Sequence, residues 1–138
     1  MSKEIILKKL EQITQLLTEL EKLLGNPFAE FVKDFVILRA AERNFQLIVD
    51  LASDINTQVL LERGRETPDT YRQSFSELLR EGILDEKLTD RLVASAQLRN
   101  ILVHEYDFDE DYKKFYQSAK DSIPAFRAYI RVIHSYVT

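Results

Sequence analysis

Apolar residues recur at helical spacing through almost the whole chain. The pattern is strictest near the N-terminus, where steps of four and three residues alternate over Ile6, Leu10, Ile13, Leu17, Leu20 and Leu24. This spacing gathers all of them on one narrow stripe of an α-helix. Burial in a core is the simplest role for the stripe, although a contact with another chain would use the same pattern. No segment alternates apolar and polar residues as a half-buried strand does, so the sequence predicts an all-α fold.

Glycine and proline mark where the helices end. Gly25 and Pro27 follow the first helical segment, Gly64 and Pro68 follow the second, and Gly82 follows a third. Glycine just beyond a helix and proline shortly after it are typical of helix termination. The breaks are short, so consecutive helices are expected to be antiparallel neighbours.

The segments between these breaks predict an antiparallel four-helix bundle with one additional short helix. A helix from about Phe28 to Leu61 would be roughly 50 Å long, so a bend or break within it is expected. A short helix follows the sequence TPDT, and another begins at Glu86. The last helix is predicted to start near Asp107 and to be kinked or split by Pro124. The predicted buried face of the long second helix contains Phe31, Phe35, Leu38, Phe45, Ile48, Ala52, Ile55 and Val59.

Length and composition limit the class of protein. The 138 residues are expected to form one domain, residues 1–138, and the 45% hydrophobic content is that of a globular protein. The absence of cysteine excludes disulfides and thiolate metal sites. No apolar run reaches the roughly 18–20 residues of a membrane span, and the N-terminus lacks the order of a secretory signal. We therefore expect a cytoplasmic protein whose net charge of −4 argues against nucleic-acid binding through bulk positive charge.

The stretch RNILVHEY, residues 99–106, is chemically unusual for a helix end. On an ideal helical wheel Arg99 falls at about 20° from Leu88, in the middle of the apolar arc, while His104 lies about 140° from Arg99. An arginine in an apolar arc needs a carboxylate, an anion or a wet cleft. A structural ion pair with Asp50 or Asp54 and a binding role toward an anion both satisfy that need.

The other two side chains of the stretch also have structural interpretations. His104 is either a surface residue that complements the helix dipole or a general acid–base, because imidazole titrates near neutral pH. Tyr106, taken alone, is interpreted as an interfacial aromatic with its hydroxyl in water. The only other histidine, His134, has no comparable neighbours and is interpreted as structural or superficial.

The stretch resembles the R-x4-H-x-Y signature of the HEPN superfamily, and in particular of its HepT-like toxins. Two further blocks, RAAERNFQLIVDLASDIN and TPDTYRQSFSELLREGILDEKL, precede RLVASAQLRNILVHEYDF in the family's order. The similarity covers about Arg39 to Phe108, and the final helix is compatible with it.

The resemblance implies a small helical bundle that forms a homodimer and cleaves RNA in a shared cleft without a metal or cofactor. Arg99 and His104 would be the catalytic pair and Asn100 would support the site. The substrate would be RNA, with tRNA as one candidate. Tyr106 would receive AMP from an MntA-like nucleotidyltransferase antitoxin, which would silence the nuclease.

Two features of the sequence weigh against parts of this interpretation. Glu105 and the acids of DFDED, residues 107–111, follow His104 and would repel RNA unless they point away; Arg72, Arg80, Lys87 and Arg91 are candidate compensators. DFDED also suggests a calcium loop, but it lacks the glycine and glutamate that an EF-hand requires, so acids in a first helical turn explain it better. The alternative function is a non-catalytic HEPN module that binds a nucleotidyltransferase and presents a substrate to it.

Overall fold

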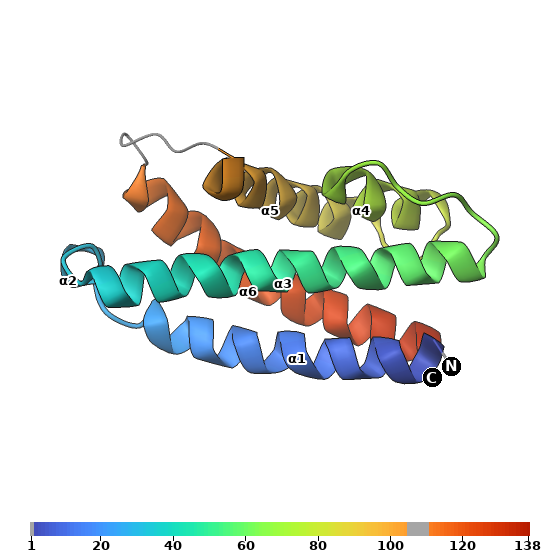
Figure 1. Ribbon diagram of the computed structural model, residues 1–138, viewed down its shortest axis with the longest axis horizontal. Coiled ribbons are helices and arrows are strands. Elements are labelled where there is room, and N and C mark those ends of the chain that lie inside the picture. Colours follow the sequence, from blue (N-terminus) through green and yellow to red (C-terminus); the bar gives the residue numbers. More distant parts are fainter. Residues whose placement is uncertain (1, 105–110) are drawn as a thin grey trace.

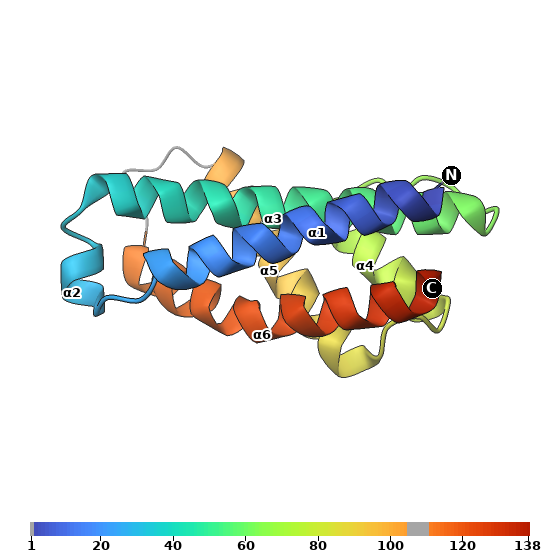
Figure 2. The same ribbon diagram turned by 90° about the horizontal axis from the view of Figure 1, so that it is seen from below.

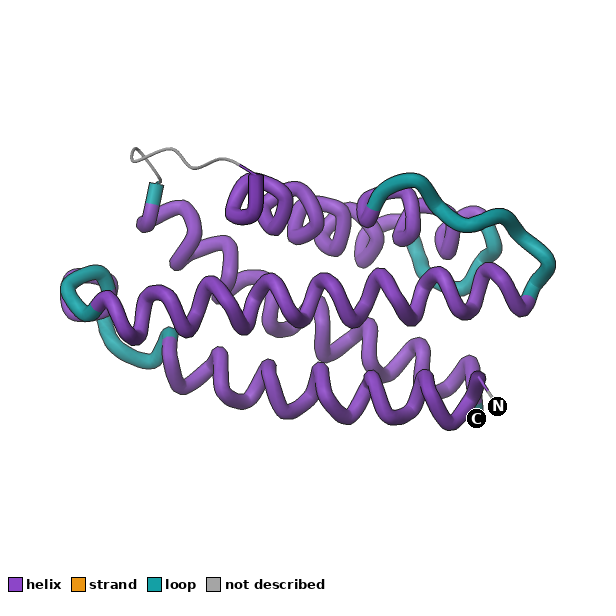
Figure 3. The backbone as a smooth tube through the Cα atoms, in the orientation of Figure 1, coloured by secondary structure: helices purple, strands orange, loops and turns teal. Residues whose placement is uncertain are grey.

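The computed structural model describes residues 2–104 and 111–138. Its elements are α1 (Ser2–Leu23), α2 (Phe28–Phe31), α3 (Phe35–Glu62), α4 (Tyr71–Arg80), α5 (Glu86–His104) and α6 (Tyr112–Val137). The long helices α1, α3, α5 and α6 run alternately in opposite directions, and both chain ends lie at one end of the bundle (Figure 1). The view from below shows α1 against both α3 and α6 (Figure 2). The predicted antiparallel four-helix bundle is confirmed, with two short helices, α2 and α4, where one was predicted. Within the described residues it contains no strand (Figure 3).

The N-terminal stripe forms part of the core. Each of its six residues is at most 3% exposed, and α1 packs against α3 and α6 along this face. Aromatic side chains from the other helices fill the centre, with Phe45 of α3 packed edge-to-face against Phe115 of α6. The core interpretation of the stripe therefore holds. None of the described helices has an apolar stretch of the length needed to cross a membrane.

The long second segment is broken, as its length suggested. Asp34 caps α3 by accepting hydrogen bonds from the backbone N–H groups of Val36 and Ile37, at 3.0 and 3.2 Å. This cap starts a new helix and changes the rotational phase of the residues that follow α2. Phe31 is consequently buried, but Phe35 is 66% exposed, so its predicted place on the buried face is wrong. The remaining residues of that predicted face are buried.

Pro124 lies inside α6 without splitting it, because α6 is a single helix from Tyr112 to Val137. Two carbonyl groups close to the proline accept hydrogen bonds from side chains. The Ser122 hydroxyl donates to the Ala119 carbonyl at 2.6 Å, and Arg91 of α5 donates to the Asp121 carbonyl at 2.9 Å. These bonds stabilise a helical backbone in which proline supplies no N–H donor.

The start of α6 also differs from the prediction. The helix begins at Tyr112, and Asp111 caps it by accepting a hydrogen bond from the Lys114 N–H at 3.0 Å. An aspartate at this place suits the orphan N–H groups of a first turn. The predicted start near Asp107 lies outside the described residues.

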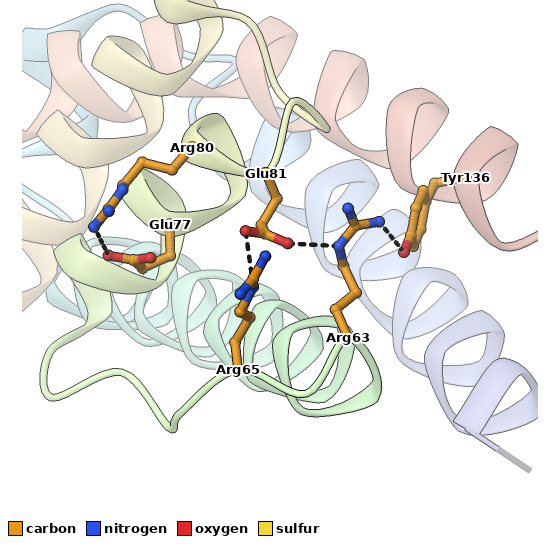
Figure 4. Close-up of polar contacts among 6 residues, drawn as sticks. All are labelled: Arg63, Arg65, Glu77, Arg80, Glu81 and Tyr136. Atoms are coloured by element: carbon orange, nitrogen blue, oxygen red, sulfur yellow. Dashed lines mark hydrogen bonds and ion pairs between the residues drawn. The ribbon is translucent and has the colours of Figure 1, made fainter.

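An ion-pair network joins the end of α3 to α4 and α6 (Figure 4). The Glu81 carboxylate accepts from Arg63 Nε at 2.7 Å and from Arg65 Nε at 3.0 Å. Arg63 also donates from Nη1 to the Tyr136 hydroxyl at 3.1 Å. The network thereby holds the C-terminal end of α3 against α4 and α6.

The network makes the stability of the bundle depend on pH. Hydrogen bonds from Arg63 and Arg65 hold the pKa of Glu81 below its ordinary value of 4.5. A lowered pKa in the folded state contributes stability that is present above pH 4.5 and is lost as the pH falls through the lowered value. The thermal unfolding midpoint of the wild type should therefore fall more steeply below pH 4.5 than that of Glu81→Gln, as measured by circular dichroism. If the unfolding midpoints of the two proteins changed with pH in parallel, protonation of Glu81 would not be linked to folding.

Candidate active site

Arg99 lies on α5 and is held by groups from two other helices. Its side chain is only 16% exposed, and Nε donates to Asp50 Oδ1 of α3 at 2.9 Å. The guanidinium carbon lies 4.5 Å from the centre of the Tyr71 ring of α4, which is the geometry of a cation–π contact. Of the two predicted ion-pair partners, Asp50 is confirmed. Asp54 instead pairs with Lys9, with 3.5 Å between Asp54 Oδ2 and Lys9 Nζ.

The remaining contacts of the guanidinium are weaker. Nη2 lies 3.4 Å from the Tyr71 hydroxyl, and Nη1 lies 3.4 Å from Asn100 Oδ1, both at the long end of the hydrogen-bond range. A guanidinium has five N–H donors. Among the described residues, three of them are engaged, which leaves one N–H on each terminal nitrogen. The arrangement can therefore offer N–H donors to an anion while the ion pair with Asp50 remains in place.

Tyr71 supplies a neutral, partly buried wall to the site. Burial raises the pKa of its hydroxyl above 10.0, and the negative charge of Asp50 raises that pKa further, while the positive charge of Arg99 lowers it. The sequence indicated Tyr71 only as an apolar residue of the short helix. Its position after the TPDT break is the one signal that placed it at the start of a helix, and nothing local indicated that it would contact Arg99.

His104 is the last residue of α5, and the structure describes its backbone but not its side chain. The helix runs from Glu86 to His104, so positions 99 and 104 lie on different faces of α5. Position 104 follows Gln97 by seven residues, about two turns, and falls on the same side of α5. Convergence of Arg99 and His104 on one phosphate therefore requires a composite cleft.

The other predicted residues are distributed as follows. Asn100 is half-buried beside Arg99, and His134 is exposed near the end of α6, which agrees with a superficial role. Tyr106 and Glu105 lie outside the described residues. Of the candidate compensating bases, Arg72 follows Tyr71 and is exposed, whereas Arg80 pairs with Glu77 at 3.2 Å. Within the described part of the chain, no group of three or more histidine, aspartate or glutamate side chains has the arrangement of a metal site.

A groove of about 440 Å³ lies between α5 and α6. Its lining includes the charged residues Arg91, Lys114 and Asp121 and small side chains such as Ala94 and Ser118. Ile101 also lines it and is 40% exposed. The groove is on the side of α5 that carries Gln97, the side to which position 104 belongs.

Comparison with known proteins connects these features to a family. The family model described as Ribonuclease HepT-like matches residues 7–133. The chain is 32% identical to the tRNA nuclease HepT of Aphanizomenon flos-aquae over 133 residues, which are 96% of this chain and 90% of that protein. It is 26% identical to the mRNA nuclease HepT of Shewanella oneidensis over 103 residues, 75% of this chain and 77% of that protein.

Solved structures show the same fold. The tri-AMPylated Shewanella oneidensis HEPN toxin in complex with MNT antitoxin superposes with a TM-score of 0.87 at 24% identity, covering 95% of this chain and 97% of that one. YutE of Bacillus subtilis, a cytosolic protein of unknown function, superposes with a TM-score of 0.71 at 20% identity, covering 92% and 89%. The family match over most of the chain, together with the 32% identity to a HepT nuclease, establishes that this chain belongs to the ribonuclease HepT-like family.

Proposed function

We propose that this chain is the ribonuclease toxin of a toxin–antitoxin pair. In this proposal a cytoplasmic homodimer cleaves RNA with Arg99 and His104, and a nucleotidyltransferase antitoxin silences it by transferring AMP to Tyr106. tRNA is the first substrate to test, since the relative with 32% identity is a tRNA nuclease. Asn100 supports the site through its contact with Arg99.

The arrangement of Arg99 carries the proposal. Asp50 accepts the Nε proton, and among the described residues each terminal nitrogen keeps one N–H without an acceptor. Two such donors match two oxygens of a phosphodiester and stabilise the charge that grows on them in the transition state. Arg72 follows Tyr71 in sequence and is exposed, and it is a candidate for the positive charge that an RNA backbone requires.

The proposed reaction is an internal transfer within RNA. His104 removes the proton of the ribose 2′-hydroxyl, and the 2′-oxygen forms a bond to phosphorus. The bond from phosphorus to the 5′-oxygen breaks, and that oxygen takes a proton from an imidazolium or from water. The products are a 2′,3′-cyclic phosphate and a 5′-hydroxyl. DNA has no 2′-hydroxyl and is spared.

The groove between α5 and α6 is the proposed dimer contact. It presents exposed apolar surface on the side of α5 to which position 104 belongs, and its small side chains allow a second helix to approach closely. A partner chain placed there would bring a second copy of the R-x4-H segment to the first.

A charge in the groove should break the dimer. Ile101→Glu is expected to convert the protein to a monomer and to lower RNA cleavage by at least about tenfold, because a carboxylate at the centre of an apolar contact is desolvated without a partner. Ile101 is 40% exposed, so the bundle itself should remain folded. Ile5→Glu is the matched control, since Ile5 is 46% exposed but lies on α1, away from the groove. Analytical ultracentrifugation measures the oligomeric state of each variant. A dimeric Ile101→Glu protein would show that the dimer contact lies elsewhere.

AMP transfer to Tyr106 would block the reaction by electrostatics. An added phosphate two residues after His104 competes with the RNA phosphate for Arg99. The Shewanella toxin was solved in an AMPylated form with its antitoxin. In this scheme Arg99 keeps its ion pair with Asp50 on α3. The AMP phosphate therefore competes with the RNA phosphate for the remaining N–H groups on the two terminal nitrogens of Arg99.

Intact mass spectrometry tests the regulatory part of the proposal. After co-expression with a nucleotidyltransferase encoded beside this chain, the wild type should gain the mass of one or more AMP groups and lose its ribonuclease activity. Tyr106→Phe should gain no mass and should stay active and toxic. An unmodified wild type, or an equal gain in Tyr106→Phe, would reject Tyr106 as the acceptor while leaving the nuclease assignment intact.

A further inference from the structure

The ion pair between Arg99 and Asp50 has an asymmetric geometry. Arginine–carboxylate pairs are often bidentate, with two oxygens on two nitrogens of one guanidinium. Asp50 instead contacts Nε through one oxygen, at 2.9 Å. Glu81 likewise accepts only from Nε, with one oxygen for each of two arginines. The Asp50 contact fixes the direction of the guanidinium, and among the described residues each terminal nitrogen keeps one N–H without an acceptor.

Tyr71 limits the same group from a second side. The guanidinium carbon lies over its ring, 4.5 Å from the ring centre, so the ring limits the movement of the guanidinium on that side. Tyr71 is the first residue of α4, whose N-cap Thr70 accepts from the Gln73 N–H at 3.0 Å. This cap sets the start of α4 and with it the position of the ring.

A buried polar network anchors that end of α4 to the core. Ser74 donates to the Tyr71 carbonyl at 2.7 Å and accepts from Asn56 of α3 at 3.0 Å. Asn56 in turn accepts from the Tyr129 hydroxyl of α6 at 2.6 Å. Ser74, Asn56 and Tyr129 are fully buried. An isolated ten-residue helix would be marginal, and these bonds explain why α4 holds the Tyr71 ring in one place.

We propose that Asp50 and Tyr71 are positioning residues for Arg99, holding its two outer N–H groups toward the scissile phosphate. The inference rests on the proposed function, since it assumes that Arg99 acts on RNA. Neither residue touches the substrate. Each acts by removing a freedom of the guanidinium: Asp50 fixes its direction and Tyr71 limits its movement on one side.

Steady-state kinetics on RNA separate positioning from a role in folding or binding. Asp50→Ala is expected to lower kcat by about 10- to 100-fold, because a small misplacement of a catalytic group has an effect of that size. KM should change less than about threefold, since the contact matters chiefly in the transition state. Asp50→Asn should restore kcat to within about threefold of the wild type, because the amide oxygen still accepts the Nε–H. Asp54→Ala is the matched control one turn further along α3.

A second pair of variants tests the ring. The chain contains another arginine with a carboxylate and a tyrosine, in which Arg63 lies 6.0 Å from the Tyr136 ring and pairs with Glu81 (Figure 4). Tyr71→Leu should lower kcat about tenfold, whereas Tyr136→Leu should leave it unchanged. This pair also decides the matter if Asp50→Ala fails to fold.

The outcomes distinguish this inference from the proposed function. Loss of activity in Arg99→Ala with full activity in Asp50→Ala and Tyr71→Leu would overturn the positioning roles alone. An Asp50→Asn protein as slow as Asp50→Ala would also overturn them, because charge rather than direction would then matter. A wild type without ribonuclease activity, or an Arg99→Ala protein as active as the wild type, would overturn both.

Discussion

Replacing Arg99 with alanine is expected to lower kcat for RNA cleavage by at least about 100-fold, the usual effect of removing one donor that stabilises transition-state charge. The bundle should remain folded. The change removes one ion pair and leaves the Asp50 carboxylate, which is 29% exposed and accessible to water. We expect the unfolding free energy to fall by about 1.5–3 kcal/mol, the range for a hydrogen bond to a charged group.

Arg99→Lys provides the control for charge. Lysine keeps the positive charge but has no planar fork, and it cannot pair with Asp50 while also placing two donors on a phosphate. Relative to Arg99→Ala, Arg99→Lys should therefore bring KM closer to its wild-type value than kcat. Measurement of kcat and KM with circular dichroism on each purified protein separates these effects. A fully active Arg99→Lys protein would show that a single positive charge is sufficient, and an active Arg99→Ala protein would remove Arg99 from the catalytic site.

Asn56→Ala is expected to destabilise the bundle more than Arg99→Ala does. Asn56 is fully buried and bonds to Ser74 and Tyr129 at 3.0 and 2.6 Å. Its truncation removes both hydrogen bonds and leaves a small cavity, so the unfolding free energy should fall by about 2–4 kcal/mol. Chemical denaturation monitored by circular dichroism measures the change.

The matched control for this variant is Asn44→Ala on the same helix. Asn44 donates to Glu19 at 3.1 Å on the solvent side, and its loss should change stability by less than about 0.5 kcal/mol. Equal effects of the two substitutions would show that the buried network adds nothing to the stability of the bundle. Because the network anchors α4, we also expect Asn56→Ala to lower kcat at temperatures where it is still folded.

The parts of the fold that depend on local periodicity could be predicted from sequence. The four–three stripe of α1 is buried throughout, and the second segment is broken, as its length suggested, although the length did not indicate that the break would fall between α2 and α3. Phe35 was misplaced because a single capping residue, Asp34, restarted the helix with a different phase. Pro124 is predicted to disturb α6, but hydrogen bonds from Ser122 and from Arg91, which is far away in sequence, stabilise the backbone around it. Such bonds depend on tertiary contacts, which periodicity does not reveal.

The candidate site shows the same division. The sequence indicated that Arg99 needs a partner and named Asp50 as one of two, because an arginine in an apolar arc is costly alone. It contained no signal for Tyr71, which reaches Arg99 only after α4 packs across α3 and α5. The family prediction from R-x4-H-x-Y is confirmed by the match over residues 7–133. The roles of Arg99, Asn100, His104 and Tyr106 stay predictions.

The nuclease mechanism is tested most directly by incubating the purified chain with an RNA in the presence of EDTA, beside the same RNA carrying a 2′-deoxy sugar at the cut position. We expect the wild type to cleave the first RNA to a 2′,3′-cyclic phosphate and a 5′-hydroxyl, to leave the second intact at that position, and to lose the reaction in His104→Ala. Cleavage of the 2′-deoxy strand at that position, or an equally active His104→Ala protein, would contradict it.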